Sequence, residues 1–280
     1  MHAPSMNRID EMAAYDAAQK VVETHRRVSS FLRAGMKLPE IDRFIAQTLD
    51  ALGCESCFYG YRPGRSGKPR FPSHSCLSVN DCIVHGTAGY YDQPMRPGDV
   101  LKIDIGVRHR GWIGDAGWTY VFGEMSPLVR RLTDCGKEAL RLGVMELRPG
   151  NRFIDWARAV QTHVEGRCGF HLVRGLGGHG LFDTRSGQPS LHAPPFISNV
   201  VPSFGDWVEA PWPCEPGELL AVEPMIAVGT GQTRERHKDW PIFTADGSVA
   251  VHYEHDVLIT KNGPRVLSEG LESVNDVIQV

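Results

Sequence analysis

The chain has 280 residues, of which 41% are hydrophobic and 22% charged, as is typical of a globular protein with a large core. Its formal net charge of −3 argues against a nucleic-acid-binding protein, because such proteins usually carry a basic domain or stripe. The sequence has neither an apolar run of about 18 residues nor an apolar N-terminal segment. We therefore expect no membrane span and no secretory signal, and we expect a cytoplasmic protein.

The spacing of apolar residues predicts a mixture of helices and strands. No repeat, low-complexity tract or linker interrupts the pattern, so we expect one α/β (α+β) domain over residues 1–280, with 1–7 flexible. In chain order the predicted elements are a helix over 8–34, a helix from Pro39 to Gly53, a loop over 58–74, strands at 75–79, 100–107 and 112–122, helices at 126–147 and 152–168, a loop over 181–206, and strands at 218–227 and 249–260.

Seven cysteines, an odd number without the spacing of a disulfide framework, indicate reduced thiols. Cys54 and Cys57 form a single C-x-x-C motif. No second C-x-x-C or H-x₃₋₅-H motif completes a zinc site around it, so we interpret these two cysteines as ordinary thiols rather than as zinc ligands.

Two aspartates stand in neighbouring predicted strands, Asp104 in VLKIDIGV and Asp115 in GWIGDAGWTYVF. The short polar segment VRHRGW between them predicts a hairpin. A turn centred between His109 and Arg110 would place the two aspartates directly opposite each other, with Cβ atoms ~5 Å apart. Carboxylates so placed repel unless one is protonated or a cation lies between them. The alternative is a longer turn that leaves both carboxylates in water.

Three more potential ligands stand in apolar or glycine-rich surroundings further along the chain. Glu223 occurs in ELLAVEPM, Glu254 in VAVHYEHDVLI and His179 in GLGGHG. Each one alone could be an ordinary structural or solvated residue. Together with the two aspartates they form an oxygen-rich set with one nitrogen, which suits two divalent first-row metal ions better than one tetrahedral zinc.

In this order the motifs SVNDCIVHG, GDVLKIDIGV, GWIGDAGWTYVFG, GLGGHG, EPGELLAVEPM and HYEHDVLIT resemble those of type I methionine aminopeptidases, in the pita-bread metallopeptidase family. The resemblance runs from about residue 8 to 270. It implies a pseudo-twofold fold of curved antiparallel sheets backed by helices. It also implies two divalent ions, of cobalt, manganese, iron or zinc, in which Asp115 and Glu254 bridge both ions. The implied ligands are Asp104, Asp115, His179, Glu223 and Glu254.

The same resemblance implies roles for two further histidines. His85, in DCIVHG, matches the histidine that faces the scissile-bond nitrogen, and His192, in SLHAPPFISN, matches the one that hydrogen-bonds the scissile carbonyl. Glu223 would take a proton from a metal-activated water and pass it to the leaving amine. The alternative for His192 is a structural role, because the segment LFDTRSGQPS makes its distance from His179 longer than is usual in the family.

The resemblance further implies an apolar substrate pocket, in which aromatic and thiol groups would suit a methionine thioether. Two segments depart from the family: the loop over 60–72 is longer, with Phe71 where tyrosine is usual, and 181–190 is expanded near the site entrance. The implied substrate-binding residues are His85 and His192 together with Tyr59, Phe71, Cys76 and Trp240.

We therefore expect an enzyme that removes the N-terminal methionine from peptides and nascent polypeptides, preferring a small second residue. Ribosome proximity and a monomeric state belong to this expectation, whereas nucleic-acid and membrane partners do not. Two alternatives stay open, namely an Xaa-Pro aminopeptidase or dipeptidase of the same fold and a non-catalytic binding module. Non-catalytic modules of this fold typically lose metal ligands, but this chain keeps all five.

Overall fold

The structure is a computed structural model that describes residues 9–64, 67–203 and 206–279. The stretch 1–7, for which we predict flexibility, lies outside the described residues. Within them, no helix is both long and apolar enough to cross a membrane. The helices are α1 (Glu11–Phe31), α2 (Leu38–Ala51), α3 (Pro127–Glu146), α4 (Phe153–Gln161), the π-helix η1 (Thr162–Cys168) and the 3₁₀ helix η2 (Leu271–Ser273).

The strands form four sheets, and every pairing in the described residues is antiparallel except that of β16 with β5. The strands are β1 (Glu55–Ser56), β2 (Cys76–Val79), β3 (Cys82–Val84), β4 (Val100–His109), β5 (Trp112–Phe122), β6 (His171–Leu172), β7 (Gly177–Asp183), β8 (Gln188–Ser198), β9 (Leu219–Val222), β10 (Met225–Ala227), β11 (Thr233–Glu235), β12 (Ile242–Thr244), β13 (Ala250–His252), β14 (His255–Thr260), β15 (Gly263–Val266) and β16 (Val277–Ile278).

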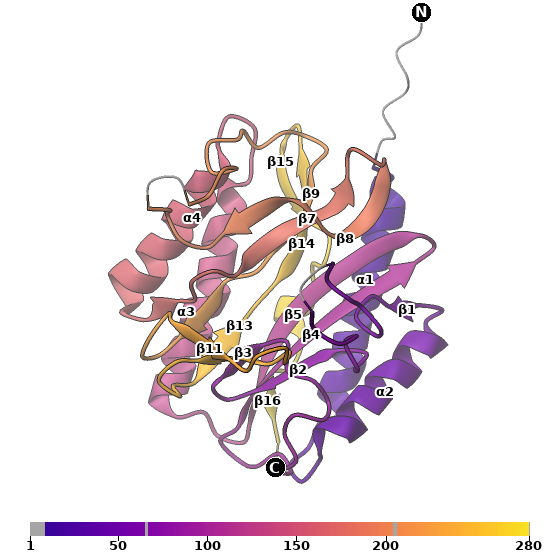
Figure 1. Ribbon diagram of the computed structural model, residues 1–280, viewed down its shortest axis with the longest axis vertical. Coiled ribbons are helices and arrows are strands. Elements are labelled where there is room, and N and C mark those ends of the chain that lie inside the picture. The colour runs from indigo at the N-terminus through magenta and orange to yellow at the C-terminus, as the bar shows by residue number, and fades with distance from the viewer. Residues whose placement is uncertain (1–8, 65–66, 204–205, 280) are drawn as a thin grey trace, which may run out of the picture.

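Two helix pairs flank the sheets (Figure 1). The indigo pair α1 and α2 contacts β4 and β1, and the pink pair α3 and α4 lies on the other side, where α3 contacts β10 and β13. The larger sheets have the orders β1-β4-β5-β16, with β2 also on β4, and β15-β14-β9-β7-β8. This architecture confirms the predicted class of antiparallel sheets backed by helices.

Local sequence explains where α1 begins and how closely it packs. The Asp10 carboxylate accepts hydrogen bonds from the backbone N–H groups of Met12 and Ala13, both at 3.1 Å, and so caps the helix. A Cβ at Gly114 on β5 would lie 2.6 Å from the Ala17 carbonyl oxygen. Glycine therefore lets the buried alanine face of α1 lie directly on this strand.

The structure corrects four of the predicted elements. The segment 181–206, predicted as a loop, contains the end of β7 and the whole of β8, because its alternation is masked by Pro189, Pro194 and Pro195. The helix predicted over 152–168 changes from α to π at Thr162. The strands predicted over 218–227 and 249–260 are both interrupted, at Glu223-Pro224 and at Tyr253-Glu254.

The predicted register of the β4–β5 hairpin is also wrong. Asp104 pairs with Gly117 and Asp115 pairs with Gly106, so the two aspartates are not directly opposite each other. The reason is the turn, which is centred between Arg110 and Gly111, both with positive φ (50° and 85°), as a tight primed hairpin turn requires. The shift is two positions on one strand, so both side chains stay on the same face in a diagonal pair.

Candidate metal and catalytic site

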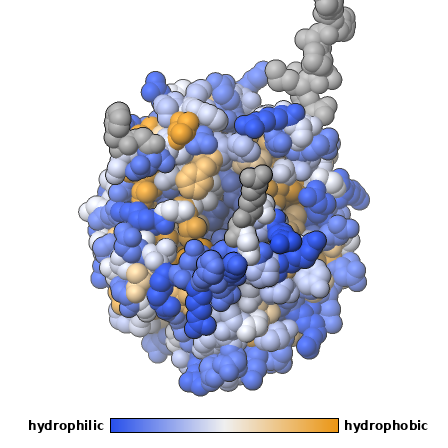
Figure 2. All heavy atoms as spheres, in the orientation of Figure 1, coloured by the Kyte–Doolittle hydropathy of each residue, from blue (hydrophilic) through white to orange (hydrophobic). Residues whose placement is uncertain are grey.

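All five predicted ligands line one cavity of about 240 Å³. Asp104 and Asp115 reach it from the β4–β5 hairpin, His179 from β7, and Glu223 and Glu254 from the two strand breaks. In the space-filling view the molecule is hollowed near the middle of the face over these strands (Figure 2). The other lining residues are Phe58, Tyr61, Pro63, Lys68, Phe71, Cys76, His85, His192, Trp240 and Ile242.

Each glutamate lies where the chain passes from one sheet to another. Glu223 connects β9 to β10, and Glu254 connects β13 to β14. The carbonyl of Glu223 accepts a hydrogen bond of 2.9 Å from the Asn199 side chain, and the N–H of Glu254 donates one of 2.8 Å to the Gly117 carbonyl. The breaks are thus anchored, and the carboxylates point into the cavity instead of continuing a strand face.

The glycines around His179 are required because neighbouring strands approach closely. A Cβ at Gly178 would lie 2.2 Å from the Ala221 carbonyl oxygen, and one at Gly180 would lie 2.2 Å from that of Pro194. The Nδ1 atom of His179 lies 3.2 Å from the Gly180 carbonyl oxygen. A carbonyl only accepts, so Nδ1 carries the hydrogen and the lone pair of Nε2 faces the cavity.

The five side chains bring acceptor atoms together without donors, an arrangement that favours a bound cation. The Nε2 atom of His179 lies 3.8 Å from a carboxylate oxygen of Asp115 and 3.8 Å from one of Glu223, beyond hydrogen-bond distance. Burial lowers the pKa of His179 to about 3, so the ring is neutral and its lone pair faces acceptors. An Oδ1 atom of each aspartate is buried without a hydrogen-bond partner among the described residues.

The pKa values of the four carboxyl groups also favour a bound cation. Burial raises the pKa of all four well above the usual range, and neighbouring carboxylates add to the effect: Glu223 acts on Asp104 and Glu254, Asp104 on Asp115, and Asp115 on Glu223. Lys102, on the same strand as Asp104, does not neutralise them, because its ammonium donates to the Asn80 carbonyl at 2.7 Å. This donor set fits divalent metal ions.

His252 is a site residue that sequence reasoning missed. Its Nε2 atom lies 3.3 Å from a carboxylate oxygen of Glu223 and 3.6 Å from one of Glu254, and neither ring nitrogen has a hydrogen-bond partner among the described residues. Two groups of potential ligand atoms, each within 4.8 Å of one another, share Glu254: Asp104, His252 and Glu254, and Asp115, His179 and Glu254. The sequence feature that indicates His252 as a site residue is the motif HYEHD, in which this histidine stands two residues before Glu254.

The two predicted catalytic histidines, His85 and His192, both line the same cavity. Both adopt a left-handed backbone conformation, His85 with φ 58° and His192 with φ 57°, which non-glycine residues rarely do outside turns and functional sites. Burial lowers the pKa of His85 to about 4, so its ring is neutral. His192 is exposed, and its Nδ1 atom lies 2.9 Å from the Tyr61 hydroxyl.

Three of the four other predicted pocket residues, Phe71, Cys76 and Trp240, form an apolar cluster with Phe58 on the cavity wall. Tyr59 does not line the cavity: it is 61% exposed and stacks on His74. The turn from Phe58 to Tyr61 explains the correction, since the Tyr61 N–H bonds to the Phe58 carbonyl and places those two rings inward.

Hydrogen bonds join the two ends of the loop that follows Tyr61. Phe71 donates its N–H to the Tyr61 carbonyl and accepts from Gly60, both at 2.8 Å, and the Trp240 indole donates to the Pro69 carbonyl at 3.1 Å. These contacts at the two ends of the loop fix the positions of the pocket rings.

Comparisons with known proteins agree with this geometry. Residues 13–261 match metallopeptidase family M24. The chain is 33% identical to the methionine aminopeptidase of Aquifex aeolicus, over 90% of this chain and 93% of that protein, and 34% identical to methionine aminopeptidase 1 of Mycobacterium tuberculosis, over 95% and 94%. The crystal structure of methionine aminopeptidase from Thermotoga maritima superposes with a TM-score of 0.80 at 28% identity, over 95% of this chain and 98% of that one.

Proposed function

Because this chain belongs to metallopeptidase family M24, and within it to the methionine aminopeptidases, we propose that it removes the N-terminal methionine from peptides and nascent polypeptides with a small second residue. The observation that carries the proposal is the convergence of two aspartates, two glutamates and a histidine in one cavity, with an apolar aromatic wall beside them. The family confirms the predicted class of enzyme, a metal-dependent hydrolase.

The donor set supports two divalent ions. Asp104 would hold one ion and His179 with Glu223 the other, while Asp115 and Glu254 would contact both. The two overlapping ligand groups support Glu254 as the shared ligand and separate Asp104 from His179, and they add His252 beside the Asp104 position. When bound, such ions supply Lewis-acid polarisation of the scissile carbonyl and a water acidic enough to act near neutral pH.

The protein's own residues handle the protons and the developing charge. Glu223 lines the cavity beside His179, and its carboxylate would accept a proton and return it to the leaving amine. His192, oriented by the Tyr61 hydroxyl, would donate a hydrogen bond from Nε2 to the carbonyl oxygen as negative charge grows there. That role requires Nδ1 to accept from the tyrosine. His85, which also lines the cavity, would face the scissile nitrogen.

The apolar wall would select the first residue of the substrate. The rings of Phe71 and Trp240 meet edge to face with centroids 5.1 Å apart, and the Cys76 thiol stays protonated because burial and Asp104 raise its pKa. A thioether packs favourably against such ring edges. The methionine side chain would occupy this cavity of about 240 Å³.

The test is a peptide panel with metal-free protein to which single divalent ions are returned. We expect release of methionine from Met-Ala-Ser and little action on Ala-Pro-Ala. Glu223→Gln should abolish turnover, whereas the exposed Glu124→Gln, matched in chemistry but remote from the cavity, should retain it. Cleavage of Ala-Pro-Ala alone would support the Xaa-Pro alternative, and no turnover with any ion would support the binding module.

A further inference from the structure

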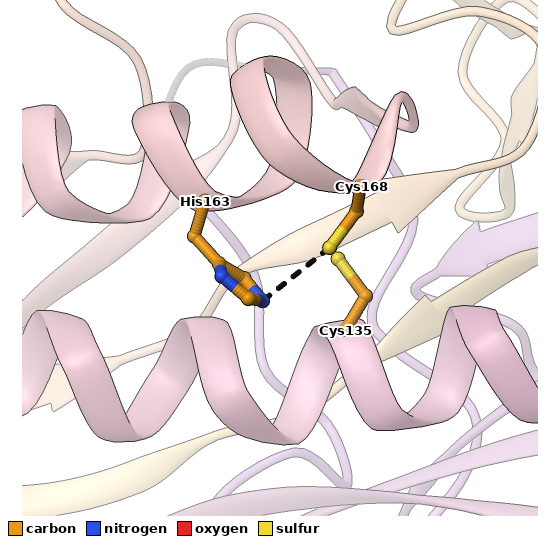
Figure 3. Close-up of side chains that lie close together, drawn as sticks. All are labelled: Cys135, His163 and Cys168. Carbon is orange, nitrogen blue, oxygen red and sulfur yellow. Dashed lines mark hydrogen bonds between the residues drawn. The ribbon is translucent and has the colours of Figure 1, made fainter.

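Outside the cavity, three side chains that ligate soft metals lie together between two helices (Figure 3). Cys135 comes from α3, and His163 and Cys168 come from η1. One potential ligand atom from each lies within 4.8 Å of the other two, and the Cys168 Sγ is 3.4 Å from the His163 Nε2. None of the three lines the cavity described above.

The π-helix is what brings two of these ligands to one face. In an α-helix, residues five apart point about 140° away from each other, because each residue turns about 100°. The wider π turn of Thr162–Cys168 reduces that angle, so His163 and Cys168 both face Cys135. The helix ends directly after Cys168, at Gly169 with φ 71°, and such local π segments are frequent at functional sites.

The surrounding contacts hold η1 in this form. Glu165, on the same turn, accepts from Gln161 at 2.7 Å and pairs with Arg174 at 2.7 Å, which ties η1 to the β6 region. Arg131 on α3 donates to the Cys168 carbonyl at 3.4 Å. The three ligand side chains are therefore placed by contacts that do not involve a metal.

We propose that Cys135, His163 and Cys168 bind one zinc ion that joins α3 to η1. Two sulfurs and one imidazole are the donors that soft or borderline ions such as zinc prefer, in contrast to the carboxylate-rich catalytic cavity. Two thiolates would balance the charge of the ion, and binding would release their protons. His163 borders a surface hollow of about 410 Å³, from which water can fill the fourth position.

The test uses cobalt as a spectroscopic probe of the reduced, metal-free full chain. Cobalt bound by thiolates gives a near-ultraviolet charge-transfer band that carboxylate and histidine ligands do not give, so the five predicted ligands of the catalytic cavity do not contribute to it. We expect a band that saturates at the amplitude of one thiolate-bound cobalt per chain, after the catalytic cavity has also taken up its ions, and that disappears when zinc is added. Cys168→Ser, a substitution at a partly exposed position, should remove the band while far-ultraviolet circular dichroism stays unchanged. Its zinc affinity should fall by more than about 10-fold in chelator competition.

Two control variants test whether other thiols give rise to the cobalt band. Cys76→Ser tests the one thiol that lines the catalytic cavity, and Cys214→Ser tests a buried thiol elsewhere; both should keep the band. The proposal is overturned by a folded, reduced protein that shows no band, or by a band that persists in Cys168→Ser. It is also overturned if mass spectrometry finds Cys135 and Cys168 joined as a disulfide and reduction produces no cobalt band.

Discussion

Replacing Glu254 by glutamine should stabilise the metal-free protein, although it removes a predicted metal ligand. Carboxylate oxygens of Asp104 and Asp115 both lie within 4.8 Å of potential ligand atoms of Glu254. Two unit charges at that distance repel by about 3.5 kcal/mol at an effective dielectric constant of about 20. Protonating one glutamate at pH 7 would relieve this repulsion at a cost of about 3.7 kcal/mol. The metal-free cluster therefore carries a penalty of this order, and we expect Glu254→Gln to recover about 2 kcal/mol of it.

The stabilisation of the metal-free protein by Glu254→Gln should depend on pH. The folded-state pKa values of the four carboxylates are raised, so the folded protein binds more protons than the unfolded chain. The unfolding free energy of the metal-free wild type is then greatest below the ordinary carboxyl pKa and falls as pH rises through the raised values. The advantage of Glu254→Gln should be small at pH 5 and grow toward pH 8.

The measurement is denaturant unfolding of both proteins in excess chelator at pH 5, 6, 7 and 8, with thermal unfolding beside it. A gain of about 2 kcal/mol corresponds to a rise of roughly 4–8 °C in Tm. Glu124→Gln, which removes an exposed charge, is the control and should change little. Adding divalent metal should reverse the order, because only the wild type keeps the full ligand set. A metal-free Glu254→Gln that is equally or less stable at pH 8 would refute the electrostatic reasoning.

Three further predictions concern individual residues of the site. Asp104→Asn should lower the metal content measured by elemental analysis while the circular dichroism spectrum is retained; full occupancy would remove Asp104 from the ligand set. His192→Ala should reduce kcat by about 100-fold with unchanged metal content, since it removes one hydrogen bond to the developing oxyanion; a change in KM alone would contradict that role. Trp240→Ala should reduce kcat/KM for methionyl peptides by about 10-fold or more through lost ring contact, and equal loss for all first residues would argue against a selective pocket.

The sequence was sufficient to predict the fold class and the candidate ligands, because each ligand stands in a recognisable strand or glycine-rich motif. It could not predict the exact hairpin register, since that depended on Arg110 adopting positive φ beside Gly111. Nor did it place the strand breaks at Glu223 and Glu254, where apolar residues continue on both sides and only the tertiary pairing with two different sheets decides.

Three other features could not be predicted from the sequence for similar reasons. Tyr59 and Tyr61 are two positions apart in one loop, and only the hydrogen-bonded turn decides which ring faces the cavity. His252 was overlooked because a strand histidine is usually structural, and its closeness to Glu223 depends on a strand break elsewhere in the chain. The grouping of Cys135 with His163 and Cys168 required a π-helix, which periodicity within an expected α-helix does not reveal.

The location of Glu223 and Glu254 at the crossing between the β9–β14 pair and the β10–β13 pair has a consequence for ion preference. Each glutamate stands at a break between a strand of one sheet and a strand of the other, so we expect the separation of the two carboxylates to depend on how these sheets pack. Substitutions in the packing beneath β10 and β13 could thus tune which ionic radius is accommodated without altering a single ligand.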